Sequence, residues 1–211
     1  MSRLLRTPPE IVDQLRRLLP APAEPASIDR ILDAALASFG AHGIKATTMT
    51  RVARDAKVSR EWLYRQYAGR DALLVAVVQR EAGRFLDGLA ERAAGATDLD
   101  GAMTETFVYA VEFLRDHPIL RRVQRTEPEV LTGRLLHDAS PVIGQATVAG
   151  AGYLTALAGV GPDAATTIAE TLVRLVTTIA LAPRGALDLH DPETLRRYAA
   201  TVVPAVIAGA T

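Results

Sequence analysis

The chain lacks cysteine, has few aromatic residues and contains almost no segment with the alternating pattern of a β-strand. Without cysteine it has no disulfide framework, no thiolate metal site and no cysteine nucleophile. The scarcity of alternating runs rich in Val, Ile and Thr argues against a sheet-based fold. No segment approaches the roughly 20 uninterrupted apolar residues that a membrane span requires, and residues 1–6 lack the apolar core of a signal peptide. We therefore expect a soluble, cytoplasmic protein without a membrane partner.

An excess of one charge is also lacking, because 24 Lys or Arg balance 24 Asp or Glu over the 211 residues. The distribution is uneven, since residues 1–75 hold 12 basic against 8 acidic residues and carry +4, which leaves −4 for the rest. Within residues 51–70, six basic residues are accompanied only by Asp55 and Glu61. A basic run on a helix is often just a solvated face, but a local basic stripe on a neutral protein is typical of a phosphate-binding surface.

Apolar residues at helical spacing dominate the chain and predict an all-α fold. Residues 1–26 are rich in proline and are expected to form an amino-terminal arm or extension. Residues 27–75 are expected to form a domain of three helices, each of which follows a residue suited to the N-cap position. These N-cap residues are Ser27, Thr48 and Ser59, and glycines end the first and the third helix.

Residues 76–211 are expected to form a larger helical domain. Proline marks the start of most of its helices, because proline is tolerated in the first turn of a helix and is excluded from its interior. The long helices predicted after the three-helix domain cover residues 71–93, 100–116, 118–125, 128–137, 141–158, 162–181 and 192–208.

The second and third short helices have the form of a helix-turn-helix. A major groove about 12 Å wide admits one helix, whose first turn must carry side chains that reach the base edges. Arg60, Glu61 and Trp62 occupy that turn, directly after Ser59. Leu63 is expected to anchor this helix to its own domain, so that its neighbours face outward.

This segment resembles the TetR family of transcriptional regulators, specifically and over residues 27–78. The resemblance rests on the runs Thr47-Thr48-Met49, Val52-Ala53, Ala56-Lys57-Val58-Ser59, Leu63-Tyr64-Arg65-Gln66-Tyr67 and Arg70-Asp71-Ala72-Leu73-Leu74. The rest of the chain resembles the family more weakly, although FLRDHPILRRVQRTEPEVL and LVRLVTTIALAPRGALDLHDPETLRRY are similar to regulatory domains of many actinobacterial members. The resemblance implies a homodimer that binds double-stranded operator DNA and carries a ligand-binding and dimerisation domain.

The resemblance also implies which residues contact DNA. Phosphates would be held, and the register set, by Thr48, Ser59, Tyr64, Gln66 and Arg70. Bases would be read by Arg60, Glu61, Trp62 and Arg65. These assignments are chemically sound, because arginine pairs with guanine, a carboxylate accepts from cytosine, and an indole packs against the methyl group of thymine.

Two residues depart from the family pattern. Lys57 stands where the family usually has a turn glycine. Either a residue with a Cβ adopts the left-handed conformation there, at a cost of roughly 1 to 2 kcal/mol, or the turn differs. Glu61 replaces a small residue, so its carboxylate needs a donor from a base or from an arginine. Arg65, four residues further on, is the expected partner.

The predicted helix at residues 100–116 is apolar around most of its circumference and must be covered on all sides. Its second face either lines a cavity for a small apolar effector or packs into an ordinary core. The residues expected to line such a cavity, chosen by position, are Phe85, Phe107, Tyr109, Phe113, Leu131 and Tyr153.

The last two long helices carry apolar stripes on more than one side. Such stripes exceed what one core covers and favour a two-fold, four-helix dimer interface. The expected interface residues are Leu172, Val173, Val176, Tyr198, Val202, Val203 and Val206. A dimer also suits a palindromic operator, because two recognition helices about 34 Å apart reach successive major grooves.

An enzymatic function is disfavoured. His137, Asp138 and Ser140 lie within four residues, whereas the members of a catalytic triad come from distant segments. The zinc-protease motif, the glycine-rich phosphate loop and paired carboxylate motifs are absent, so we expect no catalytic residue, no metal and no cofactor.

Two functions therefore remain. The leading hypothesis is a repressor that a small apolar ligand releases from its operator. The alternative is a helical small-molecule binding protein that has lost DNA binding, and Lys57 and Glu61 are the residues that raise this alternative.

Overall fold

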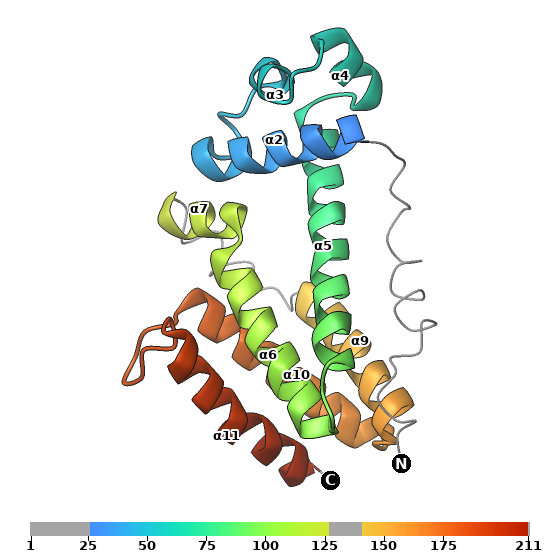
Figure 1. The fold of residues 1–211 in the computed structure, drawn as a ribbon, viewed down its shortest axis with the longest axis vertical. Coiled ribbons are helices and arrows are strands. Elements are labelled where there is room, and N and C mark those ends of the chain that lie inside the picture. The colour runs from blue at the N-terminus through green and yellow to red at the C-terminus, as the bar shows by residue number, and fades with distance from the viewer. Residues whose placement is uncertain (1–25, 127–140, 211) are drawn as a thin grey trace. The chain divides into compact units, whose positions relative to one another are not determined.

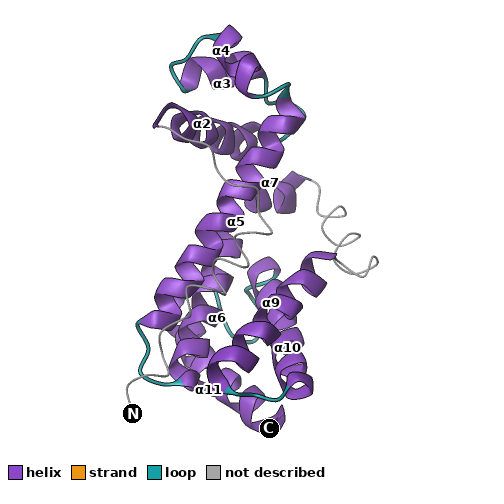
Figure 2. Cartoon of the chain, turned by 90° about the vertical axis from the view of Figure 1, so that its right-hand side faces the viewer, coloured by secondary structure: helices purple, strands orange, loops and turns teal. Residues whose placement is uncertain are grey.

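The computed structural model describes residues 26–126 and 141–210, which form helices joined by short connections (Figures 1 and 2). The all-α fold expected from the sequence is confirmed. In the described ranges no strand occurs, and an isolated bridge joins Arg184 to Asp188. The arm before Ala26, the helix predicted at residues 128–137 and Leu131 lie outside the described residues.

Most of the helix bounds predicted from the sequence are close to those observed. The helices are α2 (Ala26–His42), α3 (Met49–Asp55), α4 (Arg60–Gln66), α5 (Arg70–Ala94), α6 (Leu99–Asp116), α7 (Pro118–Thr126), α9 (Pro141–Ala158), α10 (Pro162–Leu181) and α11 (Pro192–Ala210). The predicted bounds of α9 and α10 are confirmed, and proline opens α7, α9, α10 and α11 as expected. Pro204 lies inside α11, where a helix-breaking residue was not expected.

The first described helix differs from its prediction at the start. α2 begins at Ala26, so Ser27 lies inside the helix and is not its N-cap. At the other end α2 stops at His42, and Gly43 follows with φ +84° while its amide donates to the Phe39 carbonyl at 2.9 Å. Glycine suits this left-handed position because it has no Cβ.

The described residues form two compact units. The amino-terminal unit comprises residues 26–84 and 116–126, and the carboxy-terminal unit comprises residues 85–115 and 141–210. These units, defined by contacts, differ from the domains predicted from the sequence, which divide the chain between residues 75 and 76. The difference arises because the first half of α5 and the whole of α7 pack with the amino-terminal helices.

Helices α2 to α5 supply the core of the amino-terminal unit. The buried side chains are Ile31, Leu32, Ala35, Phe39, Met49, Val52, Ala53, Ala56, Leu63, Leu73 and Val77. From α7, Ile119 packs against this core. α7 lies so close to α2 that a Cβ on Gly40 would stand 2.6 Å from the Cβ of Pro118, and glycine is therefore required for this packing.

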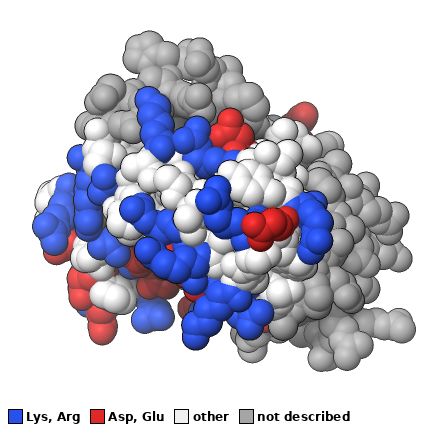
Figure 3. All heavy atoms as spheres, turned by 90° about the horizontal axis from the view of Figure 1, so that it is seen from above, with Lys and Arg blue, Asp and Glu red and all other residues white. Residues whose placement is uncertain are grey.

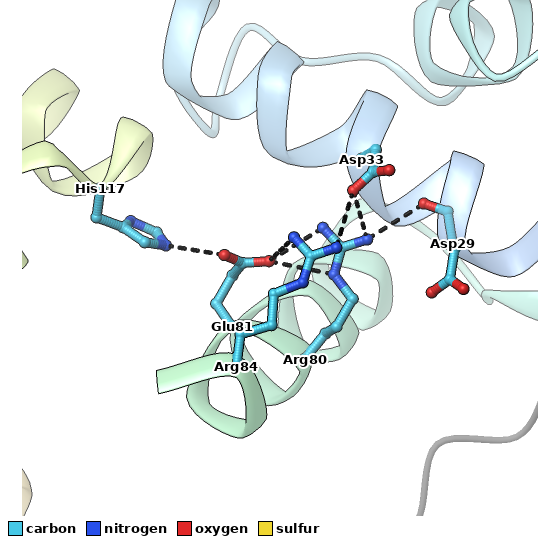
Figure 4. Close-up of polar contacts among 6 residues, drawn as sticks. All are labelled: Asp29, Asp33, Arg80, Glu81, Arg84 and His117. Atoms are coloured by element: carbon cyan, nitrogen blue, oxygen red, sulfur yellow. Dashed lines mark hydrogen bonds and ion pairs between the residues drawn. The ribbon is translucent and has the colours of Figure 1, made fainter. Parts of the chain in front are cut away.

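A polar cluster inside the amino-terminal unit joins α5 to α2 and to the start of α7 (Figure 4). Arg80 donates to the Asp29 carbonyl at 3.2 Å and pairs with the Asp33 carboxylate at 2.8 Å. Its other terminal nitrogen lies 3.0 Å from Glu81, and Arg84 reaches the same carboxylate oxygen at 3.2 Å. Two cations on the nearly buried Glu81 compensate its desolvation, so the cluster fixes how α2 lies on α5.

The imidazole of His117 completes this cluster. Its Nε2 lies 3.8 Å from Glu81 Oε2. Burial lowers the pKa of His117, and the charge of Glu81 opposes that shift without cancelling it. The neutral imidazole is therefore favoured, and the junction between α6 and α7 adds no further charge to the interior.

α6, α10 and α11 provide most of the core of the carboxy-terminal unit. Phe107, Val111, Leu154, Ile168 and Leu195 are among its buried side chains. α9 packs closely on α10, where a Cβ on Gly150 would lie 3.2 Å from that of Ala169. In the same contact, buried Thr147 donates to the Glu170 carboxylate at 2.6 Å, and Arg174 pairs with that carboxylate.

One described helix, α10, has the length and mean hydropathy that a membrane-crossing helix would need. Of the 18-residue window concerned, 39% is buried inside the protein. The helix also carries the Glu170–Arg174 ion pair. Its buried side chains, among them Ile168, Leu172 and Val176, belong to the core of the carboxy-terminal unit.

Candidate DNA interface

The first helix of the predicted helix-turn-helix, α3, is capped as the sequence predicted. Thr48 has extended backbone angles, and its hydroxyl accepts from the Arg51 amide at 3.3 Å. Met49, Val52 and Ala53 are buried, so one face of this seven-residue helix is held by the core. The cap and the buried face together compensate for a length at which an isolated helix is not stable.

The turn between α3 and α4 places Lys57 in the left-handed region, with φ 56°. The Lys57 amide donates to the Arg54 carbonyl at 3.1 Å, and the Val58 amide donates to the Ala53 carbonyl at 2.9 Å. This pair of hydrogen bonds is a Schellman motif, whose left-handed residue is usually glycine. Of the two alternatives raised by the sequence, the structure shows the strained lysine.

The recognition helix α4 begins after Ser59, whose hydroxyl accepts from the Trp62 amide at 3.1 Å. Leu63 has no exposed surface and anchors the helix, as predicted. Trp62 is only partly exposed and packs against the amino-terminal core. Its indole therefore serves packing as well as any contact with a base.

The remaining predicted contact residues of α4 lie on its outside. Arg60, Glu61, Tyr64, Arg65 and Gln66 are exposed, and 46% of Tyr64 is accessible. Neither Arg60 nor Arg65 has a hydrogen bond or an ion pair within the described residues. Their guanidinium groups are thus available to an external partner, and Arg60 lies in the first turn, from which a recognition helix reads bases.

Glu61 does not form the ion pair that the sequence predicted with Arg65. Hydrogen bonds from its own backbone amide and from the Ser59 hydroxyl lower the pKa of the Glu61 carboxyl most, while the charges of Arg60 and Arg65 contribute less. These contacts are at the amino-terminal end of α4, where unpaired helix amides favour a negative charge.

Arg70, the first residue of α5, is engaged in contacts within the unit. Its Nη1 donates to the Lys45 carbonyl at 3.0 Å, and its Nε donates to the Asp71 carboxylate at 3.3 Å. Thr47, next to these residues, is buried and donates to the Gly43 carbonyl at 2.9 Å. Sequence reasoning missed the hydrogen bond between Arg70 and Lys45, because nothing in the sequence pattern relates two residues 25 positions apart.

Basic side chains predominate over acidic ones on the face that carries α3 and α4 (Figure 3). Lys45, Arg54, Lys57, Arg60 and Arg65 are all exposed. Over its described residues the amino-terminal unit holds thirteen Lys or Arg against seven Asp or Glu, a net charge of +6. A surface of this sign and extent attracts the phosphates of nucleic acid.

The residues predicted to line an effector cavity do not all lie together in the structure. Phe85, Tyr109 and Phe113 are partly buried and contact one another, with ring centroids 5.1 to 6.0 Å apart. Phe107 instead packs into the core, where 3% of it is exposed. Tyr153 is partly buried on α9.

Burial also divides the residues predicted for the dimer interface. Leu172, Val176 and Val203 belong to the core of a single chain, and Val203 has no exposed surface. These three side chains are buried within the protomer, in a core that α10 and α11 share with α6. The partly exposed members of the predicted set are Val173, Tyr198, Val202 and Val206.

Comparison with known proteins agrees with this site. Residues 31–77 match the family of bacterial regulatory proteins described as the tetR family. An uncharacterised HTH-type transcriptional regulator of Mycobacterium tuberculosis is 26% identical over 185 residues, which cover 86% of this chain and 88% of that protein.

Solved structures show the same fold. A TetR-family transcriptional regulator from Mesorhizobium loti superimposes with a TM-score of 0.63 at 20% identity, covering 88% of this chain and 98% of that one. The TetR family repressor AlkX from Dietzia sp., implicated in the biodegradation of n-alkanes, gives a TM-score of 0.61 at 20% identity, covering 86% and 98%.

The capped pair α3 and α4, its basic face and the helical unit that follows define a helix-turn-helix DNA-binding protein. The family match over residues 31–77 and the shared fold over most of the chain identify this class of DNA-binding protein more narrowly. Residues 31–77 form the DNA-binding domain of the tetR family of bacterial regulatory proteins, and the rest of the chain shares the fold of TetR-family structures.

Strain at Lys57 gives a direct test of the turn. Replacing Lys57 by glycine should raise the free energy of unfolding by about 1 kcal/mol. Glycine has no Cβ and therefore adopts the left-handed conformation without steric strain. Urea unfolding followed by circular dichroism measures the change. Lys57→Ala is the control, since it removes the charge but keeps the Cβ. Equal stability of the two variants would show that the turn is not strained.

Proposed function

We propose that this regulator is a homodimeric repressor that binds a palindromic operator through α4 and leaves it when a small apolar effector binds. The observation that carries the DNA-binding part is the exposed outer face of α4, presented by a helix whose inner face is anchored through Leu63. A cytoplasmic location follows from such a function, and catalysis forms no part of it.

Within this proposal, α4 divides its contacts by position. Arg60 and Arg65, unpaired within the described residues, read bases together with Glu61 and the accessible edge of Trp62. Thr48 and Ser59 hold phosphates at the helix starts, and the Tyr64 hydroxyl and the Gln66 amide, further along α4, hold phosphates and set the register. Glu61 reads cytosine only if the operator draws its carboxylate away from the helix start.

Arg60 gives the sharpest test of base reading. Arg60→Ala should cost roughly 1 to 3 kcal/mol on the specific operator and less on random DNA, because a bidentate contact to guanine is lost. Fluorescence anisotropy with both DNAs measures the difference. Arg121→Ala removes an exposed arginine from α7 of the same unit and serves as the control. Equal losses on the two DNAs would instead assign Arg60 to a phosphate.

Dimerisation is expected of the family, and we assign it to the partly exposed stripes of α10 and α11. Val173 on α10 and Val202 on α11 border the buried stripes outside the core, and Tyr198 and Val206 on α11 pack against the core but keep part of their surface exposed. A partner that supplies the same two helices would cover these side chains by two-fold symmetry. Two recognition helices would then be presented to one palindrome.

A charge in these stripes should therefore separate the subunits. Val173→Glu and Val202→Glu should give monomers that lose operator binding with α4 intact, because one half-site offers only part of the contacts. Light scattering measures the mass. Thr201→Glu is the control, since Thr201 is exposed on another side of α11. Val203 is unsuitable for this test because a buried charge there would unfold the protomer. If the variants remain dimers, the assignment of the dimer interface to these stripes is wrong.

The site for the effector is assigned from the aromatic side chains of the carboxy-terminal unit. The three mutually contacting rings of Phe85, Tyr109 and Phe113 are partly buried and suit an apolar or aromatic molecule. A separate pocket of about 580 Å³ in the amino-terminal unit is lined by alanines together with charged residues such as Arg30, Asp33 and Lys57. We assign the effector to the carboxy-terminal unit because the aromatic rings lie there.

Effector binding should be visible as stabilisation. At a hundredfold excess over Kd a ligand adds about 2.7 kcal/mol, which is several degrees in Tm. A thermal-shift screen of fatty acyl, terpenoid and aromatic compounds tests this. Phe113→Trp should fill the site and abolish the shift while operator binding persists. A screen without any shift would leave a DNA-binding dimer with no small-molecule input.

The alternative, a small-molecule binding protein without DNA binding, has lost part of its basis. Lys57 completes a regular Schellman turn, and Glu61 is held at the helix start, so neither residue disrupts the reader. Electrophoretic mobility with fragments upstream of the protein's own gene separates the two functions. If no fragment is shifted, the alternative is favoured.

A further inference from the structure

A hydrogen bond joins the two ends of the segment that contains α3 and α4, the helix-turn-helix that we call the DNA reader. Arg70 Nη1 donates to the carbonyl of Lys45 at 3.0 Å, across 25 positions of sequence. Lys45 lies in the turn before α3, and Arg70 is the first residue of α5. Between them lie α3, the strained turn and α4, so the contact joins the entry of the reader to its exit.

We propose that Arg70 is a positioning residue that acts through the Lys45 carbonyl, and that it sets the geometry of the reader instead of binding a phosphate. The inference concerns an intramolecular contact that exists without DNA. Its consequence for operator affinity rests on the proposed function.

The turn that contains Lys45 is also held by hydrogen bonds of Thr47. The Thr47 hydroxyl donates to the Gly43 carbonyl at 2.9 Å and lies 3.2 Å from the Ser38 hydroxyl. The Thr47 amide also donates to the Gly43 carbonyl, at 3.2 Å. Thr48, the N-cap of α3, follows directly. The Arg70 contact thus acts on Lys45, three residues before the N-cap Thr48, and fixes the entry of the backbone into α3 against the start of α5.

The side chain of Arg70 is committed to this role. Its Nε donates to the Asp71 carboxylate at 3.3 Å, so two sides of the planar guanidinium are used within the unit. The exposed fraction of its side chain is 38%, and its neighbour Asp71 carries a charge that repels phosphate. Arg60 and Arg65 are exposed and have no such partners within the described residues, so they are better placed to meet DNA.

The test compares Arg70→Met, Arg70→Lys and Arg65→Met in the full-length protein. Amide hydrogen exchange is followed at Thr47 and Val52, whose amides donate to the carbonyls of Gly43 and Thr48. The Ala165 amide, in the other unit, is the internal control. Operator affinity is measured at several salt concentrations for the same variants.

If Arg70 positions the reader, Arg70→Met should speed exchange at Thr47 and Val52 about tenfold without DNA, the effect expected from one net hydrogen bond. Exchange at Ala165 should not change. Operator affinity should fall by a similar factor, with the salt slope changing by well under one unit. Arg65→Met should leave exchange unchanged. Arg70→Lys keeps the charge but loses the planar fork, so its exchange should stay nearer to Arg70→Met than to the wild type.

A phosphate contact gives the opposite pattern and would overturn the proposal. Arg70→Met would then leave exchange unchanged and reduce the salt slope by about one unit, and Arg70→Lys would restore both affinity and slope. Failure of the proposed function is recognised separately. In that case the wild type binds no operator fragment, while the exchange result for Arg70→Met still decides whether the contact orders the turn.

Discussion

Burial of Leu63 is the constraint on which the DNA reader depends. α3 and α4 have seven residues each, and helices of that length do not persist in water because nucleation costs more than so few hydrogen bonds return. α4 exists because Leu63 enters a core that α2, α3 and α5 have already formed, and because Ser59 caps its first turn. The outer face of α4 is therefore positioned by the core behind it.

Charge is segregated between the two units, which gives a neutral protein a strongly basic reader. Over its described residues the amino-terminal unit carries a net +6, while the carboxy-terminal unit holds six basic against eleven acidic residues, a net −5. A basic surface steers the reader to DNA, and the acidic remainder limits contact with nucleic acid elsewhere on the chain. Overall neutrality thus conceals the property that matters for binding.

Polar contacts position the reader as much as apolar ones do. Arg80 joins α5 to Asp33 of α2 and pairs with Glu81 of its own helix, and His117, just before α7, lies against the Glu81 carboxylate (Figure 4). Buried ion pairs contribute little net stability, but removing one partner strands the other, so they specify a single arrangement. Lys45 and Arg70 act similarly at the edge of the unit. A regulator must hold its reading helix in one orientation, and such contacts provide that.

Neighbouring residues alone predict the all-α class, the capped helices α3 and α4, the inward Leu63 and the resemblance of residues 31–77 to the tetR family, because caps, helical periodicity and a dense local motif are local features. The contacts of side chains with distant segments follow from the tertiary structure. It placed Val203 in the core of one chain, turned Glu61 toward its own helix start and engaged Arg70 with Lys45. Such outcomes depend on which helices meet and on which donors lie nearest in space, and periodicity along one helix carries no information about either.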